Sequence, residues 1–223
     1  MKKQLLAGLT MGLILAGSVG IASATPIALN VDFGSTDQLR IYDGIGAAPS
    51  SGTTWNGIMF SSGTNLLKYS DGSSATGISI ASTASQAYSD GGNALLGDRV
   101  FVTGSWGPFD VTISGLNSGS TYDLYVYGSN TIYASTYTVG AISDYALGGQ
   151  NLPFVYHNNY GLLEGLNATN GQIHIDVARY SGSAAAVIGG FQLIEYPVPE
   201  PATMLLLGMG IAGLAGFRLR RKK

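Results

Sequence analysis

Short runs of strand-forming residues, separated by clusters of turn residues, recur along the middle of this chain. In residues 27–33 every second side chain is apolar, which is the period of a half-buried β-strand. Similar runs lie at 57–60, 77–81, 99–103, 110–114, 122–127, 136–139, 154–157, 172–177 and 185–196. Glycine, asparagine, aspartate and serine fill the gaps and favour tight turns, and no convincing amphipathic helix interrupts the series. We therefore expect an all-β fold, a single antiparallel β-sandwich of the jelly-roll type, over residues 25–197.

One turn carries a more specific pattern, Leu116, Gly119 and Tyr122 at spacings of three residues. It resembles the turn of fibronectin type III domains, in which a tyrosine hydroxyl bonds to backbone near the turn. The same string is familiar from jelly-roll domains of other exported bacterial proteins. The opening stretch, residues 29–34, also resembles the first strand of galactose-binding-like and malectin-like jelly rolls. These resemblances imply a structural role for Tyr122.

The N-terminal 24 residues have the layout of a signal peptide. Lys2 and Lys3 precede an uncharged apolar stretch at 5–21, and Ala22 and Ala24 stand where a signal peptidase requires small residues. We expect cleavage after Ala24, while an uncleaved membrane anchor is the alternative.

The C-terminal segment, residues 198–223, has three parts. An extended Val-Pro-Glu-Pro sequence comes first, and an uncharged apolar stretch follows, for which we predict a transmembrane helix at about 202–217. A basic stop then favours the cytoplasmic side. Its residues are Arg218, Arg220, Arg221, Lys222 and Lys223. A plain C-terminal anchor would have the same physical features.

These three parts, in this order, resemble the PEP-CTERM sorting signal of Gram-negative bacteria. The resemblance implies that Pro199, Glu200 and Pro201 are recognised by an exosortase, a membrane protease, after export through the Sec machinery. It further implies an inner-membrane tethered intermediate, and then a location on the envelope surface or in the extracellular matrix. Proteins with this signal are often found in bacteria that make exopolysaccharide and biofilm.

Charge and cysteine content exclude several functions for the middle of the chain. Between residues 25 and 198, four cations stand against twelve acidic residues, so this part carries −8, whereas the whole chain carries −2. A net acidic domain disfavours nucleic acid as a partner. The absence of cysteine rules out disulfides, thiolate zinc sites and cysteine nucleophiles.

Both tryptophans lie in glycine-rich segments, where an aromatic ring could stack on a sugar. The candidate glycan-binding residues are Trp55, Trp106 and Asn56, with Asp90, Asn93 and Asp98 as further hydrogen-bonding partners. The alternative is that each tryptophan closes one end of the sandwich, because large aromatic side chains are mostly buried.

Calcium is the metal that the sequence suggests most readily, because several aspartates stand in or near turns. The candidates are Asp32, Asp71 and Asp90, while the alternative for each is a turn-forming role. We expect no other cofactor.

Catalytic motifs are absent from the sequence: it has no nucleophile elbow, no phosphate-binding loop and no zinc-protease signature. His174 alternates with apolar neighbours and is expected to face outward from a strand, and His157 stands at a strand end. We therefore expect a non-catalytic surface or matrix protein that is associated with exopolysaccharide. The alternatives are a self-associating structural protein without a ligand and, with less support, a glycoside hydrolase.

Overall fold

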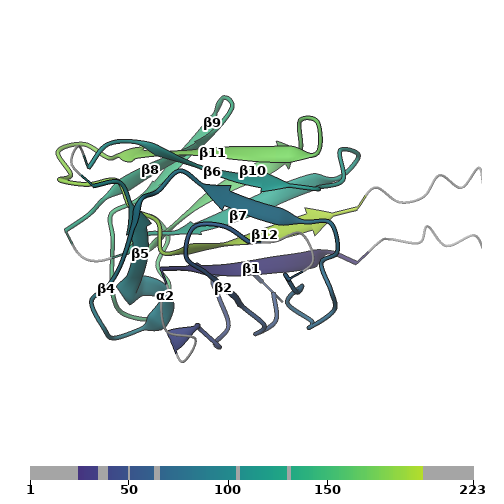
Figure 1. The fold of residues 1–223 in the computed structure, drawn as a ribbon, viewed down its shortest axis with the longest axis horizontal. Helices are drawn as coiled ribbons and strands as arrows, with labels where there is room; N and C mark the ends of the chain where they lie inside the picture. Colours follow the sequence, from purple (N-terminus) through teal and green to yellow (C-terminus); the bar gives the residue numbers. More distant parts are fainter. Residues whose placement is uncertain are drawn as a thin grey trace, which may run out of the picture. The chain divides into compact units, whose positions relative to one another are not determined.

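The first and last strands of the fold are neighbours in the middle of one sheet. In the computed structural model, which describes residues 25–34, 40–49, 51–62, 66–103, 106–129 and 132–197, β1 pairs antiparallel with β12, and Ile27 lies opposite Glu195. The spatial order in this first sheet is β10 (Tyr160–Asn167), β7 (Thr121–Tyr127), β12 (Gly190–Tyr196), β1 (Ile27–Phe33) and β2 (Asn56–Ile58) (Figure 1). Neighbouring strands are antiparallel, except that β2 runs parallel to β1.

A second sheet of five antiparallel strands lies beside the first (Figure 1). Its spatial order is β3 (Ser79–Ser82), β6 (Phe109–Ser114), β11 (Gln172–Arg179), β8 (Ser135–Val139) and β9 (Ile142–Ala146). A separate pair, β4 (Gln86–Ser89) and β5 (Asp98–Phe101), encloses α2 (Ala94–Gly97), the one helix among the described residues. The predicted all-β class and antiparallel pairing are thereby confirmed.

The strict alternation of the sequence places one side of each sheet in a common core. In β6 and β11 every second residue is buried and the residues between are accessible. One hydrophobic cluster contains side chains of both sheets, for example Val31 and Phe191 from the first and Val111 and Ile175 from the second. Burial of this apolar surface is the main driving force for folding, because the chain has no disulfides. The jelly-roll topology stays a prediction.

The tyrosine corner expected from the sequence is present. The Tyr122 hydroxyl donates a hydrogen bond to the carbonyl oxygen of Asn117 at 2.9 Å, while the ring is fully buried. The turn is closed by a bond from the Ser120 amide to the same carbonyl. Tyr122 therefore has the structural role that the resemblance implied.

A long connection after β1 covers the outer side of the first sheet. We call residues 41–49 and 51–55 the cover segment. Asn30 and Gln192 point away from the core, yet both are fully buried because they bond to this segment. The Gln192 side chain accepts from the Ala48 amide at 3.0 Å and donates to the Ser51 hydroxyl at 2.6 Å and to Asn30 at 3.0 Å. Asn30 in turn donates to the carbonyl oxygens of Ser51 and Thr54.

Residues 25–197 form one compact unit. The predicted signal peptide (1–24) and the predicted sorting segment (198–223), including the expected transmembrane helix at about 202–217, lie outside the described residues. Within the part of the chain that the structure describes, no helix is long and apolar enough to cross a membrane.

Candidate functional site

Trp55 lies beneath the cover segment rather than on the surface. Its side chain is 7% exposed, and its indole N–H donates to the Gly44 carbonyl at 2.9 Å. The ring packs edge-on against Tyr42 and Tyr127, with centroid distances of 5.1 and 6.0 Å. A buried ring cannot stack on a sugar, so the structure fits the alternative, structural role of Trp55 and does not fit the predicted sugar contact.

The side chain of Asn56 is also engaged in hydrogen bonds within the protein. Its side-chain amide donates to the carbonyl oxygens of Asn30 and Lys68, and its side-chain oxygen accepts from the Lys68 amide, each at 2.8 Å. The side chain thus joins β2 to the backbone at residue 68. The Asn56 amide, which was expected to contact a sugar, therefore makes its hydrogen bonds within the fold.

Trp106 differs from Trp55 in exposure and in backbone conformation. Its side chain is 41% exposed and stacks on Phe101 with the centroids 5.0 Å apart and the planes nearly parallel. Its φ of 49° is in the left-handed region, which bulky residues adopt only at a cost of about 1–2 kcal/mol. The carbonyl of Trp106 accepts from the Ala186 amide at 3.2 Å, so the backbone is held in place.

The neighbours of Trp106 combine aromatic rings with charged groups. Tyr133 lies nearly parallel to Trp106 at 6.4 Å, and the Arg99 guanidinium lies over the rings of Tyr133 and Tyr88 at 5.2 and 4.9 Å. Arg99 and Tyr88 are opposite each other in the β4–β5 pair, which explains this contact. Tyr88 is 53% exposed. We call Tyr88, Asp90, Arg99, Trp106 and Tyr133 the Trp106 surface.

Asp90 brings a carboxylate to the Trp106 surface. It follows β4 and forms an ion pair with Arg99 at 2.5 Å, and Gln150 donates to the same oxygen at 3.4 Å. Asp90 is one of the polar partners predicted for a sugar, and its ion pair with Arg99 places it in this surface. Asn93 uses its side-chain oxygen to cap α2, and Asp98 is buried.

Sequence reasoning missed Arg99 and Tyr88. Arg99 is one of four cations between residues 25 and 198, and Tyr88 stands in a short polar strand without clear alternation. The small number of cations was a signal that could have indicated Arg99 as a site residue. An arginine in an acidic domain usually has a specific partner. Its pairing with Tyr88 depends on the β4–β5 register, which the sequence does not reveal.

The predicted calcium ligands do not meet in one place. Asp71 is exposed, and one of its oxygens accepts from both the amide and the hydroxyl of Ser73, at 2.8 and 2.6 Å. These hydrogen bonds lower the pKa of the Asp71 carboxyl and form the turn given as the alternative. Asp90 is paired with Arg99, and Asp32 is buried in β1.

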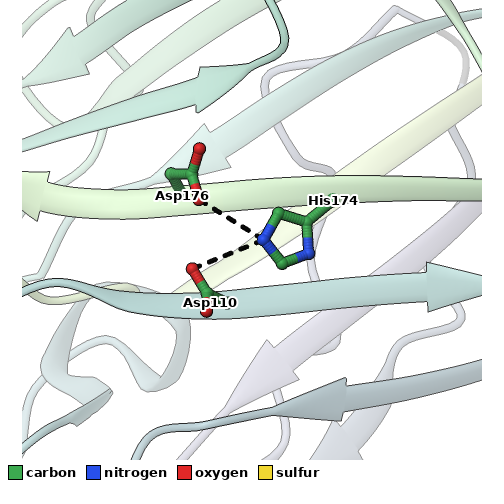
Figure 2. A group of neighbouring side chains, drawn as sticks. All are labelled: Asp110, His174 and Asp176. Carbon is green, nitrogen blue, oxygen red and sulfur yellow. Dashed lines mark ion pairs between the residues drawn. The ribbon is translucent and has the colours of Figure 1, made fainter.

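A histidine and two aspartates meet on the outer side of the second sheet. Figure 2 shows Nε2 of His174 between Asp110 and Asp176, at 3.4 and 3.3 Å. His174 faces outward, as the alternation predicted, and its other ring nitrogen bonds to Thr112. One ligand atom from each of the three residues lies within 4.8 Å of the others. All three side chains are about half exposed, so the cluster is explained as ion pairs on a solvated sheet, worth little to stability.

The second histidine is held in a stack of rings. Nε2 of His157 lies 2.8 Å from Asp144, and its ring lies between Tyr145 and Tyr156 at 4.1 and 3.8 Å. The other Asp144 oxygen accepts from the Leu162 amide. The pair therefore ties the loop before β10 to β9.

Comparison with known proteins bears on the C-terminal segment. Residues 197–222 match the family model of the PEP-CTERM protein-sorting motif, which confirms the resemblance seen in the sequence. Neither the curated proteins nor the solved structures gave a match to this chain. The comparisons thus identify a sorting segment and leave the folded unit to be interpreted from its own geometry.

Proposed function

We propose that this chain, which carries a PEP-CTERM sorting motif at residues 197–222, is an exported, non-catalytic protein of the cell surface or extracellular matrix. It contacts exopolysaccharide through the Trp106 surface. The motif supports sorting to the cell surface by an exosortase system. The contact with exopolysaccharide and its place on the protein are the further steps of the proposal.

The sorting step has a direct test. In the proposal, signal peptidase produces a mature chain that starts at Thr25, and an exosortase then removes the basic tail near Pro199 and Glu200 of a membrane-tethered intermediate. Intact-mass measurement on each compartment of the native host should find a surface form that lacks Arg218 to Lys223. A membrane form that retains these residues as the final product would mean a stable anchor and would contradict processing.

For the fold, we infer that the two five-stranded sheets pack face to face as a jelly-roll-like sandwich. The shared hydrophobic cluster supports this arrangement, because its side chains come from both sheets. In such a fold the loops at one end are free to carry a binding surface.

The observation that carries the glycan contact is the strained, exposed position of Trp106. A bulky side chain in the left-handed region persists only where surrounding structure enforces it, and such positions cluster at functional sites. Around it, Tyr88 offers a second exposed ring, and Asp90 and Gln150 offer hydrogen-bonding groups, while the buried Arg99 holds Asp90 in place. Aromatic rings with a few placed polar groups are the general composition of a small-molecule site.

The charge of the folded unit bears on the kind of glycan, and the carboxylates of the Trp106 surface bear on catalysis. The net charge of −8 between residues 25 and 198 favours a neutral or cationic glycan. The Trp106 surface has a single carboxylate, Asp90, which Arg99 already neutralises, whereas a glycosidase uses two carboxylates across a cleft.

The binding test uses protein purified from its host and the exopolysaccharide of the same host. Trp106→Ala and Tyr88→Ala should abolish co-sedimentation with the polysaccharide while the circular dichroism spectrum stays unchanged. Tyr196→Ala is the matched control, because Tyr196 is as exposed as Trp106 and belongs to β12. Equal binding by the Trp106→Ala protein would contradict the proposal. Assembly that depends on protein concentration alone, without polysaccharide, would favour the self-associating alternative.

A further inference from the structure

Two buried carboxylates in the folded unit accept fewer hydrogen bonds than buried carboxylates usually do. Asp32 in β1 and Asp98 at the start of β5 are 0% and 1% exposed. Oδ1 of Asp32 and both side-chain oxygens of Asp98 are inaccessible and accept no well-formed hydrogen bond. Buried carboxylates are normally paired, hydrogen-bonded or bound to a metal, so these three oxygens need an explanation.

Both carboxylates border the same short piece of chain. The second oxygen of Asp32 accepts from the Tyr42 amide at 2.8 Å, and Asp98 lies 3.3 Å from the Arg40 guanidinium. The last strand also links them, since Gly190 is the partner of Asp32 in the sheet. A Cβ at the preceding residue, Gly189, would lie 3.1 Å from the carbonyl oxygen of Asp98. Gly189 thus lets β5 approach β12, and the end of β1 is also close to β5, because a Cβ at Gly34 would lie 2.7 Å from the carbonyl oxygen of Arg99.

The two groups also influence each other electrostatically. The pKa of Asp32 is raised to about 7: burial is the largest cause and the charge of Asp98 adds to it, while the Tyr42 hydrogen bond and Arg40 act in the opposite direction. Burial raises the pKa of Asp98 as well. Ser89 lies close enough to lower the pKa of Asp98, although its hydroxyl makes no well-formed hydrogen bond with that carboxylate. Two like charges close together in a dry site destabilise the fold unless a cation joins them.

The cations nearby are too few to neutralise this pair. Arg40 is a single charge that lies against Asp98 and also bonds to the Ser89 hydroxyl. Arg99, the next residue in β5, is paired with Asp90. Arg40 therefore leaves one negative charge uncompensated when both carboxylates are ionised.

We propose that Asp32 and Asp98 bind a calcium ion that fixes the cover segment and β5 to β1. Hard cations take oxygen ligands in variable geometry, so carboxylates from two different strands, with backbone carbonyls and water, suit calcium better than magnesium. With two carboxylates and a nearby arginine, the dissociation constant is expected on the order of 10⁻⁴–10⁻³ M, the range of extracellular calcium modules. Of the sequence candidates, only Asp32 belongs to this site.

The aromatic side chains beside Asp32 provide a direct measurement. Tyr42 donates its amide to Asp32, and the ring of Trp55 lies 5.1 Å from that of Tyr42, so both can transfer excitation to a bound terbium ion. Terbium added to the full chain in EDTA-treated, detergent-containing buffer should give saturable sensitised luminescence, which calcium displaces. Calcium should also raise the melting temperature of the parent protein.

Asp32→Asn and Asp98→Asn should lose both the luminescence and the calcium-dependent rise in melting temperature. Asp176→Asn is the matched control, because it changes an aspartate of the exposed cluster in Figure 2 and should keep both responses. The Asp32→Asn protein should fold in EDTA at least as well as the parent, since it loses a buried charge, whereas Asp98→Asn also removes the carboxylate partner of Arg40 and is compared with and without calcium.

Three results would overturn the proposal. The first is a parent protein whose melting temperature and terbium luminescence do not respond to calcium. The second is luminescence that Asp176→Asn abolishes and Asp32→Asn leaves intact, which would place the ion in the exposed cluster. The third is an unchanged calcium response in Asp98→Asn.

Discussion

The two tryptophans occupy opposite kinds of environment although their local sequences are alike. Trp55 and Trp106 both stand in glycine-rich loops, yet the first is 7% exposed and the second 41%. Trp55 belongs to a cluster with Tyr42 and Tyr127, which the cover segment closes over the first sheet. Trp106 stacks on Phe101 and leaves much of its ring in solvent.

The environment of a loop tryptophan is therefore determined by partners that are distant in the sequence. Tyr127 comes from β7 and stands 72 residues after Trp55 in the chain, and it is available because its side of the sheet is covered. Trp106 stacks on Phe101, five residues before it, and lies nearly parallel to Tyr133, 27 residues after it. The four predictions below concern the buried region first and the exposed surface last.

Removing the Trp55 ring should have the largest effect. Trp55→Ala leaves a cavity between Tyr42 and Tyr127 and an unpaired Gly44 carbonyl, so the free energy of unfolding should fall by about 3–5 kcal/mol. Chemical denaturation measures it directly. A loss similar to that of Trp106→Ala would show that the two environments do not differ in energy.

The buried carboxylate of Asp32 should make stability depend on pH. The unfolded chain releases the Asp32 proton near pH 3.8, whereas the folded chain keeps it to about pH 7. The folded state therefore binds more protons in this range, and the free energy of unfolding falls as pH rises from 4 to 7, by at most about 4 kcal/mol.

Denaturation in EDTA at several pH values checks this dependence. Asp98 also has a raised pKa, and Arg40 lowers the pKa of both carboxyls. The slope of the free energy of unfolding against pH therefore reports Asp32, Asp98 and Arg40 together. Asp32→Asn should flatten the slope, and an equal slope in parent and variant would assign the effect to other groups.

The buried amide network should contribute somewhat less. Gln192→Ala removes the acceptor of the Ala48 amide and of the Tyr127 hydroxyl, and it should lower the free energy of unfolding by about 2–3 kcal/mol. Gln172→Ala is the control, because Gln172 is exposed and its side chain donates a hydrogen bond to the exposed Ser114 hydroxyl, so its loss should be close to zero. Equal losses in a urea titration would mean that the cover segment is not held by Gln192.

Much of the fold could be predicted because it depends on local pattern. Residues 27–33, 110–114 and 172–177 alternate in sequence and form β1, β6 and β11 in the structure. The tyrosine corner followed from the spacing of Leu116, Gly119 and Tyr122, because that turn closes within a few residues. The order of strands did not follow, since pairing β1 with β12 depends on contacts between residues 158 to 168 positions apart in the chain.

The candidate site could be predicted only in part. The sequence identified Trp106 and Asp90 as candidate residues, but it could not show that Arg99 and Tyr133 connect them. Nor could it show that Asn56 and Trp55 are used within the fold. The cover segment is the physical reason. It buries Asn30 and Gln192 through hydrogen bonds with its backbone, and polar burial of this kind leaves no periodic signal in the sequence.

The smallest change in stability is expected for Trp106, and its variants test whether the ring is needed for binding. Trp106→Ala should cost no more than about 0.5–1.5 kcal/mol, the value of one aromatic contact, because the residue is largely exposed. Trp106→Gly should be more stable than Trp106→Ala by about 1 kcal/mol, since glycine adopts a φ of 49° without strain. Thermal melts of both variants measure the difference. A role of the Trp106 ring in binding requires that both variants lose binding to exopolysaccharide. Full binding by the glycine variant would contradict that role.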